Sequence, residues 1–172
     1  MDHLSDALDR FRCYKDLDIE DFLRTKARNY LERGWCSVYL IVDEKAFDAG
    51  KIKVDAYFTL SHKSLIAEGL SKTKVKETSG FKDSASIHFV LIGQLGKYIA
   101  KLEDGTECRA DITSAEILDF AFEIIRASSA LIPCRCVLVE CSENPKVQQV
   151  YKDYHFSEFQ YDGEHYQLYK RL

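Results

Sequence analysis

The stretch CVLVECSENPKVQQVYKDYHFSEF, residues 136–159, decides the fold of this 172-residue chain. Its opening run of apolar residues is typical of a strand buried on both faces. Asn144 followed by Pro145 is typical of a capped helix start. Four residues then fall on one helix face at spacings i, i+3, i+4 and i+7: Val147, Val150, Tyr151 and Tyr154. The stretch therefore predicts a strand, a short helix and a second strand.

The neighbouring segments extend this pattern. Downstream, SEFQY and HYQLYKR are two short strands joined through Asp162-Gly163, which predicts an antiparallel hairpin. Upstream, IHFVLIGQLGKY (87–98) has the composition of a central strand. Thr113 and Glu116 form a capping box, which predicts a helix that Pro133 ends. Strands 87–98 and 134–142 are then parallel neighbours, each followed by a helix.

The N-terminal half predicts one helix and a hairpin. Residues 18–34 have an amphipathic pattern, with Asp18 as the expected N-cap and Gly34 as the stop. Strands at 36–44 and 51–61 form an antiparallel hairpin with residues 45–50 as its turn. Residues 62–86 lack a strong pattern and are expected to be a functional or mobile loop with room for a helical turn, and residues 99–111 are expected to be a connecting loop. Together the segments predict one α/β domain over residues 1–172.

Composition excludes several classes of protein. The formal net charge of −4 provides no global basic field, which argues against nucleic acid as a partner. No apolar run approaches the length of a membrane span and the N-terminus lacks a signal-peptide core, so we expect a cytoplasmic protein without a membrane partner. The six cysteines are then expected to be free thiols. Cys134, Cys136 and Cys141 could suggest a zinc site, but the sequence has no second close pair of ligands, so no metal is expected. Neither Cys134 nor Cys136 has a sequence-defined base partner that would make it a nucleophile.

Three pieces of the sequence resemble the GCN5-related N-acetyltransferases (GNAT). LIGQLGKY (91–98) is similar to the family's fourth strand, residues 136–159 to its fifth strand, helix and sixth strand, and YDGEHYQLYKRL to its last hairpin. The resemblance implies a mixed, mostly antiparallel sheet with a splayed parallel central strand pair and helices on both faces. It also implies an enzyme that transfers the acetyl group of acetyl-CoA, its co-substrate, to an amine by direct attack.

The resemblance assigns cofactor contacts to two segments and one helix cap: Gln94, Leu95, Gly96, Lys97, Thr113, Ser114 and Asn144. Leu95 and Lys97 would offer backbone groups to the pantetheine arm, and Asn144 would lie near it. The pyrophosphate would meet the helix start at Thr113 and Ser114. The sequence departs from the family because the usual glycine-rich phosphate loop is missing its second glycine. It also departs at His155, where the family has glycine.

The resemblance also implies the catalytic residues. Tyr151 matches the family tyrosine that protonates the departing thiolate, although its periodicity alone favours core packing. Glu140, near the carboxyl end of its strand, is a candidate general base or, equally, a structural carboxylate paired with a neighbour. His88 and Glu68 are weaker candidates, and water could accept the proton instead.

The acceptor stays open at this stage. We expect a small-molecule or peptide amine, and the family allows a homodimer. Two alternatives remain: a non-catalytic acyl-CoA-binding regulatory domain on the same scaffold, and a GNAT toxin that acetylates aminoacyl-tRNA. The lysines at 72, 74 and 76 are expected to be a solvated loop rather than a contact for the adenosine 3′-phosphate.

Overall fold

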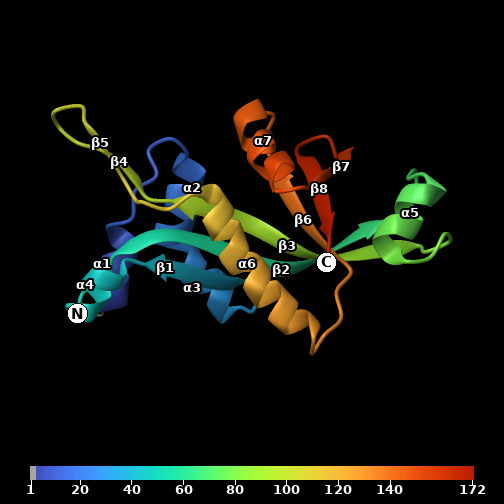
Figure 1. Cartoon of the computed structure of the whole chain (residues 1–172), viewed down its shortest axis with the longest axis horizontal. Helices are drawn as coiled ribbons and strands as arrows, with labels where there is room; N and C mark the ends of the chain where they lie inside the picture. Colours follow the sequence, from blue (N-terminus) through green and yellow to red (C-terminus); the bar gives the residue numbers. More distant parts are fainter. Residues whose placement is uncertain (1–2) are drawn as a thin grey trace. The chain divides into compact units, whose positions relative to one another are not determined.

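The computed structural model describes residues 3–172, and six strands form one mixed sheet in the order β1-β2-β3-β6-β8-β7 (Figure 1). Their bounds are Ser37–Val42 (β1), Val54–Ile66 (β2), Ser86–Lys97 (β3), Cys136–Cys141 (β6), Ser157–Tyr161 (β7) and Tyr166–Arg171 (β8). Strands β3 and β6 are parallel, whereas β6–β8 and β7–β8 are antiparallel. The prediction of a mixed α/β sheet with a parallel strand pair is confirmed.

The parallel pairing between β3 and β6 is short. Its register joins Val90 to Val137, Leu91 to Leu138 and Ile92 to Val139. Strand β3 continues to Lys97 and β6 to Cys141, past the last of these pairs. The residues expected to bind the cofactor therefore begin where this register ends.

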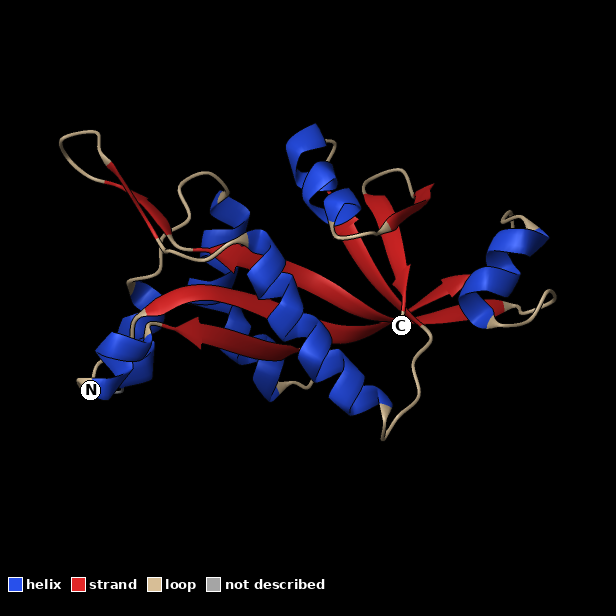
Figure 2. Ribbon diagram, in the orientation of Figure 1, coloured by secondary structure: helices blue, strands red, loops and turns tan. Residues whose placement is uncertain are grey.

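The helices are more numerous than predicted (Figure 2). They are α1 (His3–Asp9), α2 (Leu17–Asp21), α3 (Ala27–Glu32), α4 (Glu44–Asp48), α5 (Lys72–Ser79), α6 (Ser114–Ser129) and α7 (Pro145–Asp153), with a π-helical turn, η1 (Phe22–Lys26), between α2 and α3. The N-cap of α2 is Asp16, not Asp18, because the Asp16 carboxylate accepts the Ile19 N–H at 3.2 Å. Asp18 lies in the first helical turn.

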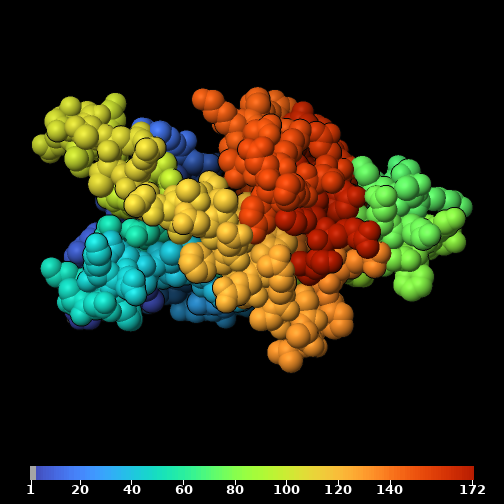
Figure 3. Space-filling view, viewed as in Figure 1, coloured from blue at the N-terminus to red at the C-terminus, as the bar shows by residue number. Residues whose placement is uncertain are grey.

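Three segments expected to be irregular are ordered. Within residues 62–86, β2 continues to Ile66, α5 follows and β3 begins at Ser86, so the prediction of a long irregular loop was wrong. The expected turn at 45–50 contains α4. The loop at 99–111 contains a separate antiparallel pair, β4 (Ile99–Lys101) and β5 (Glu107–Arg109), which protrudes from its surroundings (Figure 3).

The chain divides into two compact units, and β2, β3 and α6 contribute residues to both. Unit 1 comprises the residues up to Thr59 together with Gln94–Leu118. Its core is built around the buried side chains of Phe11, Phe22, Leu23 and Tyr57. The Tyr57 hydroxyl donates to the Ile19 carbonyl at 2.7 Å, which ties α2 to β2.

Unit 2 comprises Leu60–Gly93 and Asp119–Leu172. One face of its strands buries Phe89 of β3, Leu138 of β6, Phe159 of β7 and Tyr169 of β8 in a common cluster. The Phe159 ring packs edge-on against both Phe89 and Tyr169. No helix among residues 3–172 has both the length and the apolar character needed to cross a membrane.

Candidate functional site

In unit 1 the backbone of β3 presents two alternating edges. The Tyr98 N–H donates to the Asp55 carbonyl of β2 at 2.8 Å, and the Gln94 N–H donates to the Thr59 hydroxyl at 2.9 Å. Because backbone groups alternate along a strand, Leu95 and Lys97 direct theirs to the edge that faces away from β2. Of the four residues predicted on this strand, Leu95 and Lys97 therefore have the backbone orientation that an added strand-like ligand requires.

Gln94 and Gly96 contribute differently. The Gln94 side-chain oxygen is buried without a hydrogen-bond partner among residues 3–172, so it can accept an N–H from a ligand. A Cβ at Gly96 would lie 2.5 Å from Ile19 Cγ2 and 2.6 Å from Tyr57 Cε1. The missing side chain at Gly96 is explained by this close packing of α2 and β2 against β3.

The start of α6 has the predicted capping box. Thr113 donates its N–H and its hydroxyl to Glu116, each at 2.7 Å, and accepts the Glu116 N–H at 3.2 Å. The Thr113 hydroxyl and N–H hold the pKa of Glu116 below its usual value. The Thr113 N–H is therefore engaged by Glu116, and its expected contact with pyrophosphate stays a prediction.

The first-turn N–H groups of Ser114 and Ala115 have no acceptor within the helix, as at any helix start. Lys97 lies beside them, because its ammonium donates to the Ile112 carbonyl at 2.8 Å. Unit 1 thus brings together two of the predicted contacts, Lys97 and Ser114. The site then has three features: an unpaired acceptor at Gln94, an outward backbone edge and a cation at a helix start. They suit a ligand that carries both amide and phosphate groups, such as acetyl-CoA.

In unit 2 the most informative side chain is Tyr151 of α7. It is 8% exposed, and its ring meets Phe156 edge-on at a centroid distance of 5.6 Å. Its hydroxyl has no hydrogen-bond partner among residues 3–172, whereas the Tyr154 hydroxyl donates to Asp119 at 2.6 Å. Burial raises the pKa of Tyr151, with a smaller contribution from Cys141. Tyr151 is therefore a buried phenol that stays protonated and has its proton available to donate.

Local sequence signals position Tyr151. The Asn144 side chain caps α7 by accepting the Lys146 N–H at 3.0 Å, and Pro145 opens the helix. Helix α7 ends at Asp153, and His155 follows two residues later with a left-handed backbone, φ of 67°, where the family has glycine. The capping role of Asn144 is confirmed, but its expected place near pantetheine stays a prediction.

Glu140 of β6 is held in a polar network. One of its oxygens accepts from Gln167 at 2.7 Å and lies 3.2 Å from the Lys63 ammonium, and the other lies 3.4 Å from that ammonium. Gln167 is 2% exposed and also donates to Asp162 at 3.1 Å. Both carboxylate oxygens are engaged within this network, so the contacts of Glu140 favour the structural alternative over the general base.

The other two candidate general bases, His88 and Glu68, have less structural support. The two ring nitrogens of His88 lie 2.7 Å from the Ser64 hydroxyl and 3.3 Å from the Ser86 hydroxyl. Glu68 is exposed at the end of β2. Within the described part of the chain, no three His, Cys, Asp or Glu side chains gather as a metal site requires. Lys63 and Gln167 were not predicted, because their pairing with Glu140 depends on strand register, which no local pattern reveals.

Comparison with known proteins places the fold. No family model and no curated protein matches the sequence. Among solved structures, AtaT complexed with acetyl-methionyl-tRNAfMet matches with a TM-score of 0.71 and 21% identity, covering 95% of this chain and 86% of that one. AtaTR bound with AcCoA matches with a TM-score of 0.70 and 21% identity, covering 95% of this chain and 86% of that one. A tyrosine-to-phenylalanine mutant of KacT matches with a TM-score of 0.73 and 16% identity, covering 99% of this chain and 91% of that one.

These TM-scores establish a shared fold. The chain has the GNAT fold of AtaT and KacT along almost its whole length. The fold implied by residues 91–98 and 136–159 is thereby confirmed.

Proposed function

We propose that this protein is an acetyl-CoA-dependent N-acetyltransferase whose acceptor is the α-amino group of an aminoacyl-tRNA. The observation that carries the proposal is Tyr151: a phenol that is 8% exposed has no hydrogen-bond partner among residues 3–172. The Tyr151 oxygen is not among the buried unpaired polar atoms, so the hydroxyl reaches the surface of an otherwise buried side chain with its proton uncommitted. It is well suited to a reaction that needs one proton delivered.

The proposed reaction assigns a role to each candidate residue. Acetyl-CoA supplies an activated acetyl thioester. In unit 1, the backbone groups of Leu95 and Lys97 and the Gln94 side chain would bind and align the pantetheine arm. Ser114 and the Lys97 ammonium would bind phosphate. In unit 2, the Tyr151 hydroxyl would donate its proton to the departing thiolate sulfur.

The state of Glu140 bears on the acceptor. Because this carboxylate is engaged by Lys63 and Gln167, the proposed reaction assigns it no role as a base. A lysine amine, with a pKa of about 10.4, would need one, whereas an α-amine, with a pKa of about 7.7–8.0, is partly neutral at pH 7 without help. This supports an α-amine as the proposed acceptor, in place of the side-chain amine of a peptide or a polyamine.

Structural similarity supports the RNA part of this proposal. AtaT, with which the chain shares its fold, has been captured with acetyl-methionyl-tRNAfMet, an α-amine acetylated on a tRNA. The acidic net charge argued against a nucleic acid, but net charge does not exclude a local cationic surface. An aminoacyl-tRNA thus replaces the small-molecule or peptide amine expected from the sequence.

The test begins with calorimetry of acetyl-CoA binding. It continues with an acceptor panel of charged tRNAs, a lysine peptide and a polyamine, with uncharged tRNA as the control, and with products identified by mass spectrometry. We expect binding, and acetylation of aminoacyl-tRNA alone. Failure to bind acetyl-CoA would refute the enzyme. Binding without transfer to any acceptor would support the regulatory alternative. Transfer only to the peptide or polyamine would refute the proposed acceptor.

A further inference from the structure

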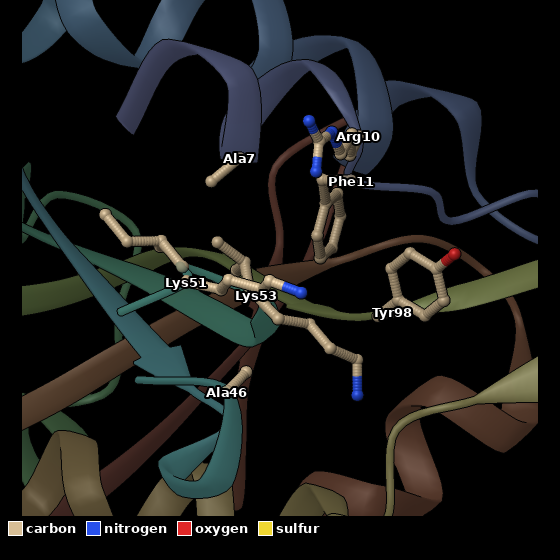
Figure 4. Close-up of a pocket in the computed structure, with 9 residues that line it drawn as sticks. Ala7, Arg10, Phe11, Ala46, Lys51, Lys53 and Tyr98 are labelled. Atoms are coloured by element: carbon tan, nitrogen blue, oxygen red, sulfur yellow. The ribbon is translucent and has the colours of Figure 1, made fainter. Parts of the chain in front are cut away.

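Unit 1 contains a groove of about 310 Å³ whose lining includes three cations and no carboxylate (Figure 4). The cations are Arg10, Lys51 and Lys53, and the remaining lining residues are apolar or aromatic. Arg10 and Phe11 follow α1, the lysines lead into β2, and Tyr98 follows β3. Three segments far apart in sequence thus build one positively charged groove on a chain whose net charge is −4.

Two of the cations are available to a ligand. Lys53 is neutralised, because its ammonium lies 3.1 Å from Asp43 and 3.2 Å from Asp55. Arg10 and Lys51 are exposed and have no ion-pair partner among residues 3–172. The groove therefore has two unpaired positive charges, which suit an anionic ligand.

The floor of the groove is apolar and includes one accessible aromatic ring. Phe11 is 1% exposed and supports the half-buried ring of Tyr98, which it meets edge-on at 6.1 Å. The Tyr98 hydroxyl has no hydrogen-bond partner among the described residues. The small side chains of Ala7 and Ala46 line the same groove and leave room in it. Cations beside an aromatic ring are the combination that binds unpaired nucleotides.

We propose that this groove binds an unpaired nucleotide of the acceptor RNA, with Arg10 and Lys51 on its phosphates and its base against the Tyr98 side of the floor. This inference rests on the proposed aminoacyl-tRNA acceptor and names a place where the protein recognises it. A stretch of duplex would satisfy the two cations but could not enter the groove. A free nucleotide has the same chemistry, and the tests below separate these ligands.

The first test uses the double variant Arg10→Ala/Lys51→Ala, with Lys45→Ala as the matched control. Lys45 is an exposed lysine of α4, which precedes Lys51 in the chain, and it does not line the groove. Binding of tRNA is measured without acetyl-CoA over a range of salt concentrations. We expect the double variant to bind about tenfold more weakly, with a log–log salt slope reduced by about two, because two phosphates are no longer neutralised by the protein. Lys45→Ala should match the native protein.

The second test asks whether the base enters the groove. Ala46→Leu fills the groove without changing a charge, so it should raise the KM for aminoacyl-tRNA severalfold and leave the salt slope unchanged. Acetyl-CoA affinity should be unaffected in all variants. Adenosine monophosphate should compete with tRNA only at concentrations far above the tRNA dissociation constant.

The outcomes separate this inference from the proposed function. Native protein that binds tRNA but acetylates no aminoacyl-tRNA would refute the function, while the binding test would still decide the groove. Equal losses of affinity in the double variant and in Lys45→Ala, or no tRNA binding by the native protein, would overturn the groove. A duplex that binds as well as tRNA, an unaffected Ala46→Leu or tight competition by the mononucleotide would overturn the unpaired RNA nucleotide as its occupant.

Discussion

At the level of single residues, the periodicity of α7 presented core packing and the proposed acid role of Tyr151 as alternatives. Its ring packs against Phe156 as a core residue does, and its hydroxyl lacks a partner among residues 3–172. Burial raises its pKa, so the proton is retained at neutral pH. Packing and the proposed acid role are therefore compatible in one side chain.

Glu140 provides a test at the same scale. Since Lys63 and Gln167 engage its carboxylate, Glu140→Gln should change kcat by less than about threefold. A general base would instead lose about 10²–10⁴-fold. The measurement is steady-state kinetics with aminoacyl-tRNA, with thermal unfolding as a control for folding. A hundredfold loss of kcat in a folded variant would restore Glu140 as the base.

His155 carries backbone strain that glycine would not. With φ at 67°, a residue with a Cβ costs about 1–2 kcal/mol, partly offset by the greater freedom of glycine in the unfolded chain. His155→Gly should therefore raise the free energy of unfolding by about 0.5 kcal/mol, measured in urea. His155→Ala keeps the Cβ and should give no gain. Equal stability of the two variants would show that the left-handed backbone at His155 does not destabilise the protein.

At the level of elements, the packing of α2 and β2 onto β3 depends on Gly96. In Gly96→Ala the new methyl group would lie 2.5 Å from Ile19 Cγ2 and 2.6 Å from Tyr57 Cε1, so the elements must separate. We expect a loss of about 1–3 kcal/mol in unfolding free energy. Adding Ile19→Ala should recover part of that loss, because one of the two obstructing side chains is shortened. A fully stable Gly96→Ala would contradict the packing.

Elements marked by strong local signals were predictable from the sequence. Asn144-Pro145 located α7, the Thr113–Glu116 pair located α6, and Asp162-Gly163 located the last hairpin. Helix α5 also had such signals, since Ser71 caps it and Gly80 ends it with φ of 92°, but its lysine-rich sequence obscured its amphipathic pattern. The π-helical turn η1 and the strand pair β4–β5 have no comparable local signal.

The site was predictable to a smaller extent. The alternation of β3 follows from its being a strand, so the outward backbone of Leu95 and Lys97 could be anticipated. The Glu140–Lys63 pair could not, because it joins β2 and β6, whose residues are 77 positions apart. The groove around Arg10 and Lys51 was equally hidden, because it is assembled from three distant segments.

At the level of the whole molecule, the proposed reaction fixes a pH dependence. The acceptor α-amine must lose its proton, so kcat/KM should rise with pH up to about 8. Because burial raises the pKa of Tyr151 above its ordinary value near 10, the acid stays protonated and no falling limb should appear between about pH 8 and pH 10. The measurement is the pH profile of kcat/KM with aminoacyl-tRNA. A bell-shaped profile that declines above about pH 8.5 would contradict the assignment.

The central claim is that this chain acetylates an α-amine on tRNA with Tyr151 as the proton donor. The most direct measurement is the rate of acetyl transfer from acetyl-CoA to aminoacyl-tRNA by native protein and by Tyr151→Phe, with acetyl-CoA affinity measured in parallel. We predict transfer by the native protein, a loss of at least about a hundredfold in kcat for the variant, and unchanged cofactor affinity. Equal rates in the two proteins would contradict the role of Tyr151, and no transfer by the native protein would contradict the activity itself.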